Sequence, residues 1–271
     1  MHRMRRITTT LAAVVATCAA LAATALAATI TGDDGDNRLI GTRAADTINA
    51  LGGDDLARGL AGDDIVNAGA GNDVGFGGQG NDTLNGGDGN DRLHGRRGND
   101  TVNGEAGDDR VWGGMENDVL SGGDGADRVG GRDGNDQGDG GPGNDLMSGG
   151  RGDDTQRAGE GDDRVFANLG VDETFGGPGN DDLWALARGD VAAPGDTTAD
   201  TLHGEEGDDT FHVRDGEADV VDCGAGNDTV LADPHDTVTT DCENVDRQEP
   251  RPKEDGAEKK TEVPKEDKGT S

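Results

Sequence analysis

Apolar residues return every nine positions along most of the chain, and each stands between two polar or small neighbours. Leu84 in DTLNG, Leu93 in DRLHG and Val102 in DTVNG are consecutive examples. Alternate side chains of a strand point to opposite faces, so one apolar residue per triplet predicts a three-residue strand with one buried position. The residues between the triplets follow G-G-x-G-x-D, whose glycines accept the backbone angles of turns.

Turn, strand, turn and strand together take 18 residues, which predicts one coil of a parallel β-roll. The expected fold class is therefore all-β, a right-handed β-solenoid of nonapeptide repeats. Strands one coil apart lie about 4.8 Å apart, so roughly twelve coils would make a rod about 55 Å long. The predicted interior residues are Val66, Leu84, Leu93, Val102, Val111, Leu120, Val129 and Val165.

Composition alone argues against a folded chain. There are 57 acidic residues against 24 basic ones, the net charge is −33, and apolar residues make up 30%. Such a chain buries too little apolar surface to offset the entropy lost on ordering. The regular period of the glycines and acids reverses this interpretation, because stacked repeats stabilise one another.

Aspartate is the most regular feature of the repeat. It recurs at every ninth residue from Asp46 to Asp190. The segment ARGDVAAPGDTT is then expected to shift the register by one residue, and aspartates follow at Asp200, Asp209, Asp219 and Asp228. Stacking would bring aspartates 18 residues apart into columns along each edge of the roll. Such crowding of like charges is unfavourable unless a cation lies between them.

Carboxylates and the carbonyl groups of glycine turns are hard oxygen ligands, which suit Ca²⁺ in flexible, irregular sites. Mg²⁺ requires a more regular site, and Zn²⁺ prefers Cys or His, whose spacing in this chain fits no zinc site. We therefore predict multiple Ca²⁺ sites. The predicted ligands are Asp46, Asp64, Asp73, Asp82, Asp91, Asp100, Asp109, Asp118, Asp127, Asp136, Asp145, Asp154, Asp163, Asp181, Asp209 and Asp228.

The segments GGQGNDTLN, GGDGNDRLH and GGPGNDLMS resemble the nonapeptides of the RTX, or hemolysin-type calcium-binding repeat, family. The resemblance covers roughly residues 32–246. It implies a parallel β-roll with Ca²⁺ held between successive turns by the sixth-position aspartates and glycine-turn carbonyls. Asp55 and Asp172 follow segments without the first glycine pair and are left out of the ligand set. The toxin and protease domains of some family members have no counterpart here, so no lytic activity is carried over.

Residues 1–27 are expected to be a signal peptide. MHRMRR is basic, LAAVVATCAALAATALA is a short run of small apolar residues, and the final ALA fits cleavage after Ala27. A lipoprotein anchored at Cys18 is disfavoured, because Thr17 precedes the cysteine and the apolar run continues past it. Cleavage would remove three arginines and no acid, which changes the charge to −36, and would leave no transmembrane segment.

Two cysteines, Cys223 and Cys242, remain after cleavage. They are 19 residues apart, close to one coil, so stacking could bring them to disulfide distance. An even count in an exported chain favours a disulfide, which would close the C-terminal end of a roll over residues 28–246. Residues 247–271 mix charges with proline and are expected to form a disordered tail.

The seventh and ninth repeat positions should point outward, and alternate repeats share a face. One face carries six candidate recognition residues: Arg92, Arg110, Arg128, Arg164, Trp112 and Trp184. Arginine and aromatic side chains suit a glycan or a polyanion. The alternative is that the arginines offset the aspartate columns and the rings cover thin strands. The opposite face carries a row of asparagines, Asn49, Asn67, Asn85 and Asn103, which predicts a hydrogen-bonded amide ladder.

Three successive inward positions on one side lack an apolar residue: Gly138, Gln156 and Thr174. One interpretation is a slot or a hinge. The other is a worn stretch, meaning one in which the repeat has simply lost its apolar residues, and calcium, rather than packing, provides stability.

These features predict a secreted, extracellular calcium-binding repeat protein whose folding is driven by Ca²⁺. An adhesin that binds a glycan or another cell-surface polymer is the alternative. An enzyme is disfavoured, because HExxH and GxSxG are absent and the only serines are Ser121, Ser148 and Ser271. The high negative charge also disfavours nucleic acid as a partner.

Overall fold

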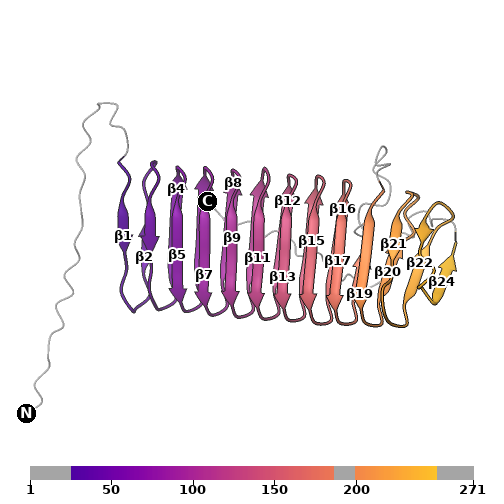
Figure 1. The fold of residues 1–271 in the computed structure, drawn as a ribbon. Coiled ribbons are helices and arrows are strands. Elements are labelled where there is room, and N and C mark those ends of the chain that lie inside the picture. The colour runs from indigo at the N-terminus through magenta and orange to yellow at the C-terminus, as the bar shows by residue number, and fades with distance from the viewer. Residues whose placement is uncertain (1–25, 186–198, 249–271) are drawn as a thin grey trace, which may run out of the picture.

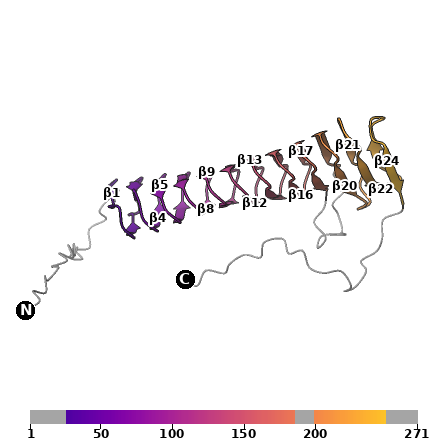
Figure 2. The same ribbon diagram turned by 90° about the horizontal axis from the view of Figure 1, so that it is seen from below.

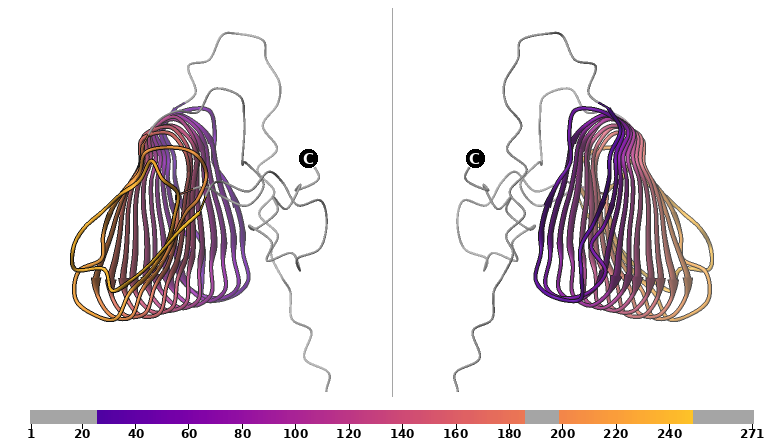
Figure 3. Two further views of the ribbon diagram at one scale, coloured as in Figure 1. Left: turned by 90° about the vertical axis from the view of Figure 1, so that its right-hand side faces the viewer. Right: turned by 90° about the vertical axis from the view of Figure 1, so that its left-hand side faces the viewer.

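The computed structural model describes residues 26–185 and 199–248, and every helix or strand element in these ranges is a β-strand (Figure 1). The strands form two 12-stranded parallel sheets. Odd-numbered strands make sheet A and even-numbered strands make sheet B, so the chain alternates between them. The two sheets run as two layers along the roll (Figure 2), and successive coils follow a common outline (Figure 3). The predicted β-solenoid is confirmed.

The strand bounds follow the repeat closely. Sheet A contains β1 (Thr29–Thr31), β3 (Thr47–Asn49), β5 (Ile65–Ala70), β7 (Thr83–Asp88), β9 (Thr101–Ala106), β11 (Val119–Asp124), β13 (Gln137–Pro142), β15 (Thr155–Glu160), β17 (Glu173–Pro178), β19 (Thr201–Glu206), β21 (Val220–Asp222) and β23 (Thr237–Val238). Sheet B contains β2 (Arg38–Ile40), β4 (Leu56–Ala61), β6 (Val74–Gln79), β8 (Arg92–Arg97), β10 (Arg110–Met115), β12 (Arg128–Asp133), β14 (Leu146–Arg151), β16 (Arg164–Leu169), β18 (Asp182–Trp184), β20 (Thr210–Val213), β22 (Thr229–Ala232) and β24 (Asn244–Arg247).

The predicted strand length of three residues is wrong for most coils, because the glycine pair belongs to the strand. β7 has six residues, TLNGGD, and its second glycine, Gly87, pairs with Gly69 of the preceding coil. Gly87 has a φ of 111°, and a Cβ there would overlap the carbonyl of Gly69. The glycines therefore allow close stacking of backbones, and the turn that follows is shorter than the sequence suggests.

The thin apolar interior lies between the two sheets. All eight predicted interior residues are buried, and the most exposed of them, Val129, is 4% exposed. Met147, Leu183, Leu202 and Phe211 continue the same row toward the C-terminus. Along residues 26–185 and 199–248, no helix is long and apolar enough to cross a membrane.

A slot, which was one of the two interpretations of this stretch, is not formed at Gly138. A Cβ at Gly138 would lie 2.9 Å from Cε of Met147, so the methionine of sheet B already fills this space. Gln156 is buried, and one amide orientation satisfies both of its ends. Its nitrogen then donates to the carbonyl of Phe166 at 3.2 Å, and its oxygen accepts from the backbone N–H of Gly149 at 2.7 Å. This polar stretch therefore links the two sheets.

The one-residue shift expected after Asp190 is part of a longer insertion, because the nine residues counted as the repeat at Asp190 also fall outside the column spacing. The backbone N–H of Asp172 donates to Asp200, 28 residues later, whereas regular coils place such partners 18 residues apart. Asp200 thus takes the place directly after Asp181 in the alternation of sheets, and Asp190 lies outside the described residues. Counting in nines cannot distinguish a further repeat from a loop of similar length.

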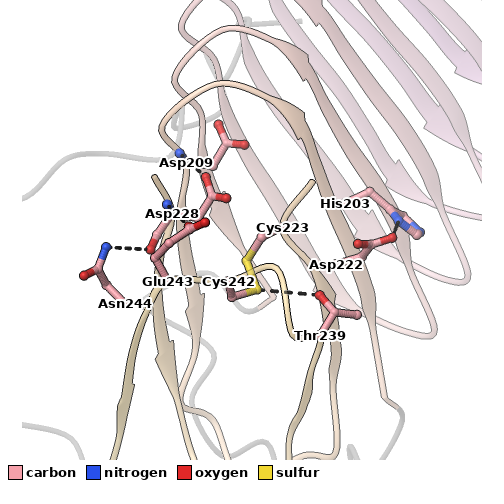
Figure 4. Close-up of a disulfide and its surroundings, with 9 residues drawn as sticks. All are labelled: His203, Asp209, Asp222, Cys223, Asp228, Thr239, Cys242, Glu243 and Asn244. Atoms are coloured by element: carbon pink, nitrogen blue, oxygen red, sulfur yellow. Dashed lines mark hydrogen bonds and ion pairs between the residues drawn. A yellow bond between two sulfur atoms is a disulfide. The ribbon is translucent and has the colours of Figure 1, made fainter. Parts of the chain in front are cut away.

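The C-terminal end of the roll is closed by the predicted disulfide between Cys223 and Cys242, whose Cα atoms are 5.3 Å apart (Figure 4). The last strand reaches into the segment that was expected to be the tail. Arg247 is the last residue of β24, and its guanidinium donates to the carbonyl groups of Asp233 and Asp236. Residues 1–25 and 249–271, which contain most of the expected signal peptide and tail, lie outside the described residues.

Candidate metal centres

The sixth-position aspartates form the two predicted columns, one along each edge of the roll. In each column, Oδ1 of one aspartate accepts a hydrogen bond from the backbone N–H of the aspartate one coil earlier. Asp82 donates in this way to Asp100 at 2.8 Å, and Asp91 donates to Asp109 at 2.7 Å. All sixteen predicted ligands are buried in these columns, each with at most 4% exposed.

The second carboxylate oxygen, Oδ2, is the unusual atom of the site. In most coils it is buried and has no hydrogen-bond partner among the described residues. Leaving such an atom unsatisfied costs about 1–3 kcal/mol. The residues concerned are Asp55, Asp64, Asp73, Asp82, Asp91, Asp100, Asp109, Asp118, Asp127, Asp136, Asp145, Asp154, Asp163, Asp181, Asp209, Asp219 and Asp228. A buried oxygen without a hydrogen-bond partner that recurs at the repeat period indicates that a group from outside the chain binds here, because a packing defect would affect only one coil.

In most repeats the first residue of the pair is a glycine, which keeps space open beside this oxygen, whereas Ala50, Ala68 and Ala158 take its place in others. A Cβ at Gly86 would overlap Oδ2 of Asp91 and would also lie against the carbonyl oxygen of Gly104 in the next coil. A Cβ at Gly104 would meet the equivalent oxygens of Asp109 and Gly122. Carboxylate and carbonyl oxygens therefore converge on one point in successive turns. These hard oxygen donors fit Ca²⁺.

The carboxyl groups of the columns have raised pKa values. Burial, opposed by the backbone hydrogen bond and reinforced by neighbouring aspartates, raises the pKa of Asp82 to about 7 and that of Asp154 to about 8. The same cause raises the pKa of Asp91 to about 6. Without a cation, folding therefore shifts these aspartates toward the protonated form.

Four aspartates omitted from the predicted ligand set occupy the same columns. The backbone N–H of Asp55 donates to Asp73 at 2.7 Å, and Asp172 donates in the same way to Asp200. Asp200 donates in turn to Asp219 at 2.8 Å. Their positions follow from the stacking of coils, so loss of a local glycine pair does not displace them. The aspartate period was the signal that could have identified them.

The regular spacing ends at the cap, where other acids take the column positions. Asp219 donates its backbone N–H to Asp236, 17 residues later, and Asp228 donates to Glu243, 15 residues later. Figure 4 shows Asp209, Asp228 and Glu243 following one another in this way. Asp236 and Glu243 do not follow from the aspartate period, because neither lies at the repeat spacing.

A local group of three carboxylates was also missed. Asp215, Glu217 and Asp219 alternate in DGEAD, and each offers one oxygen within 4.8 Å of the others. Asp219 belongs to a column, so this group extends the edge of the roll near the cap. The alternating acids in a segment that lacks the glycine pair were the available signal.

The outward side chains also lie on the predicted faces. The amide ladder on sheet A is confirmed, because Asn67, Asn85 and Asn103 each donate to the preceding asparagine at 2.8 Å. The six candidate recognition residues all lie on sheet B. Arg164 and Trp184, however, both interact with Asp182, which separates them from the rest.

The sequence was also compared with known proteins. The family model described as RTX calcium-binding nonapeptide repeat (4 copies) matches residues 31–56, 50–84, 85–120, 104–138, 112–147, 139–156, 148–183 and 194–230. A search of curated proteins finds no match. The family matches cover most of the roll, including the coils in which the orphan carboxylate oxygens recur.

Proposed function

Because the chain belongs to the RTX calcium-binding nonapeptide repeat family, we propose that it is a secreted protein whose folding is driven by Ca²⁺. The observation that carries this proposal is the buried, unpartnered Oδ2 that recurs in coil after coil, in most of them beside a glycine without a side chain. When bound, Ca²⁺ would supply positive charge to these columns. The sixteen predicted aspartates and the four additional ones, Asp55, Asp172, Asp200 and Asp219, would hold it.

The proposed coupling follows from the way these sites are assembled. Each site takes oxygens from two coils, so it does not exist in the unfolded chain. A ligand that binds only the folded state stabilises it by RT ln(1 + [L]/Kd), or about 1.4 kcal/mol per site at ten times Kd. Contributions from several coils add, whereas the thin interior supplies little stability by itself. Extracellular calcium modules bind at about 10⁻⁴ to 10⁻³ M, which fits folding outside the cell.

The disulfide supports the proposed location. Disulfides persist in oxidising, extracellular compartments, and Cys223–Cys242 joins two consecutive parts of the cap. The basic and apolar segments before Ala27 would direct the chain to export. A chain that needs millimolar Ca²⁺ would stay unfolded in the cytosol and fold after secretion.

The test is a Ca²⁺ titration of residues 28–271 followed by far-ultraviolet circular dichroism, with Mg²⁺ as the control cation. Neighbouring residues provide a matched pair of variants. Asp109→Asn changes a buried column residue, whereas Asp108→Asn changes an exposed turn residue at a position where other repeats carry asparagine. Each variant removes one negative charge from the same turn.

We expect a cooperative gain of β-structure with Ca²⁺ and little with Mg²⁺. Asp109→Asn should raise the midpoint Ca²⁺ concentration and reduce the number of ions bound at equilibrium dialysis, and Asp108→Asn should change neither appreciably. A chain that is equally stable in chelator and in Ca²⁺ would contradict the proposal. So would identical titrations for the two variants.

A further inference from the structure

The outward face of sheet B from β4 to β12 is basic, although the protein as a whole is strongly acidic. β4, β6, β8 and β10 contain no acidic residue. β12 contains one, Asp133, which pairs with Arg151 at 3.6 Å. We call this surface the basic aromatic face, and its members are Arg58, Phe76, Arg92, His94, Arg96, Arg110, Trp112, Arg128 and Arg132.

Charge is divided between the two sheets at equivalent backbone positions. Arg96 and Arg132 of sheet B follow the inward glycine of their strands, with φ values of 92° and 94°. The same position in sheet A carries Glu105 and Glu205, with φ values of 77° and 76°. The arginines are therefore concentrated on one side, and do not simply compensate the aspartates that lie along both edges.

The rings of the basic aromatic face form one continuous stack. The centroids of Phe76 and His94 are 5.3 Å apart, and those of His94 and Trp112 are 4.4 Å apart, with nearly parallel planes. The guanidinium groups of Arg58 and Arg96 lie 5.2 and 4.6 Å from the centre of the Phe76 ring. Contacts on both sides hold the stack in place before any ligand binds, which reduces the entropy lost on binding.

The stack ends at Trp112, and the surface beyond it is open. The next outward positions of this row are Gly130 and Ser148. A Cβ at Gly130 would lie 3.2 Å from Cδ1 of Trp112, so the indole reaches over the edge of the glycine. Arg128 and Arg132 stand on the two sides of Gly130 in the same strand. Trp112 and two arginines of the strand thus flank a position without a side chain.

Sheet B has a second aromatic group, which consists of Phe166, Trp184 and His212. It differs from the first because its polar atoms already interact with Asp182. Asp182 accepts from Nε of Arg164 at 2.8 Å and from Nε1 of Trp184 at 2.9 Å, and it lies 2.8 Å from Nε2 of His212. In contrast, Arg92, Arg128 and Arg132 form no salt bridge within the described part of the chain. Of the two groups, the first therefore has three arginines, Arg92, Arg128 and Arg132, whose charges are available to a ligand.

We propose that the basic aromatic face binds an anionic polysaccharide, with a sugar ring against Trp112 beside Gly130 and its acidic groups at Arg128 and Arg132. Guanidinium groups bind carboxylate and sulfate in paired geometry, and indole rings pack against flat, weakly polar surfaces. Five strands at about 4.8 Å spacing give a strip roughly 20 Å long. A flexible polysaccharide can follow this strip, whereas a long nucleic acid duplex would be repelled by the acids elsewhere on the rod.

The test measures binding of dextran sulfate by isothermal titration calorimetry, with neutral dextran as the matched ligand. All proteins are kept in the buffer in which circular dichroism shows them folded, so the result does not depend on what drives folding. Arg128→Gln/Arg132→Gln removes two charges from the face. Arg43→Gln/Arg157→Gln removes two charges elsewhere and is the control. Trp112→Leu is paired in the same way with Trp184→Leu.

We expect dextran sulfate to bind and dextran not to bind. Arg128→Gln/Arg132→Gln should raise Kd about tenfold or more and make it less dependent on salt, and the control pair should change Kd less than about threefold. Trp112→Leu should weaken binding and Trp184→Leu should not; this pair also decides the matter if the double variant fails to fold. Absence of binding at low salt, or equal loss in variant and control, would overturn the proposal. Duplex DNA binding as tightly as dextran sulfate would overturn the choice of polysaccharide.

Discussion

Two stretches of the interior are built differently, although the aspartate columns pass through both. From β7 to β12, the first inward position of every strand is aliphatic, as with Leu84 of sheet A and Leu93 of sheet B. From β13 to β17, the inward positions of sheet A are Gly138, Gln156 and Thr174. The first stretch is stabilised by burial of apolar surface, and the second by the Gln156 hydrogen bonds and by Met147 from the opposite sheet.

The difference shows that the roll does not need an aliphatic residue in every coil. A polar side chain is tolerated inside when both ends of its hydrogen-bonding group find partners, which Gln156 achieves across the interior. The aspartate columns are the structural element that the two stretches share. Changing the columns should therefore affect both stretches, and changing an interior residue should affect only one.

The largest effect is expected from pH in the absence of Ca²⁺, because it acts on the columns of both stretches. Burial raises the pKa of Asp118 and Asp154 to about 8 and that of Asp100 to about 6. An acid with a raised pKa in the folded state binds more protons there than in the unfolded state. Its stabilising contribution is complete below its unfolded pKa and is lost as the pH rises through the folded value.

In chelator, the free energy of unfolding should therefore fall as the pH rises from about 5 to about 8. The apparent Kd of the folded protein for Ca²⁺ should fall over the same range, because Ca²⁺ and protons compete for the same carboxylates. Thermal melts in chelator at several pH values, with Ca²⁺ titrations beside them, measure both trends. Stability in chelator that increases with pH would show that the columns are not buried and proton-binding as the structure indicates.

The next largest effect should come from the aliphatic stretch. Leu93 is fully buried, and Leu93→Ala would leave a cavity that costs about 2–5 kcal/mol of unfolding free energy. Val119→Ala is the matched control, since Val119 is 48% exposed on the outer face of sheet A and should lose well under 1 kcal/mol. Thermal or urea unfolding in saturating Ca²⁺ measures both. Equal losses would mean that the interior residue contributes no more than a surface one.

Gln156→Leu tests whether Gln156 is a specific link between the two sheets or merely a worn position. Leucine would bury more apolar surface, so a merely worn position should gain stability. The carbonyl of Phe166 and the N–H of Gly149 would, however, each lose a hydrogen bond to Gln156. We therefore expect a loss of about 1–3 kcal/mol. Gln137→Leu is the control, because it makes the same substitution at an exposed position in the adjacent strand of the same sheet. A Gln156→Leu variant more stable than the parent protein would show that position 156 is merely worn.

The fold and the columns could be predicted because both follow from the nine-residue period, which is a property of the sequence alone. The six-residue length of β7 could not, since Gly87 extends the strand only through pairing with Gly69. The sequence also places Asp182 on the same face as Arg164 and Trp184, but the geometry of their contacts decides that one carboxylate engages both. Contacts between coils or across the interior are set by three-dimensional distances, which the period does not contain.

Gly138→Ala should have the smallest effect and shows how the polar stretch is filled. The new methyl group would lie 2.9 Å from Cε of Met147, which must move away. Methionine adapts easily, so we expect a loss of only about 1 kcal/mol. In a Met147→Val background the contact is gone, and the same Gly138→Ala change should be neutral or slightly stabilising. The double-mutant cycle, measured by urea unfolding in saturating Ca²⁺, gives the coupling; if the two changes are additive, Met147 does not occupy the space at Gly138.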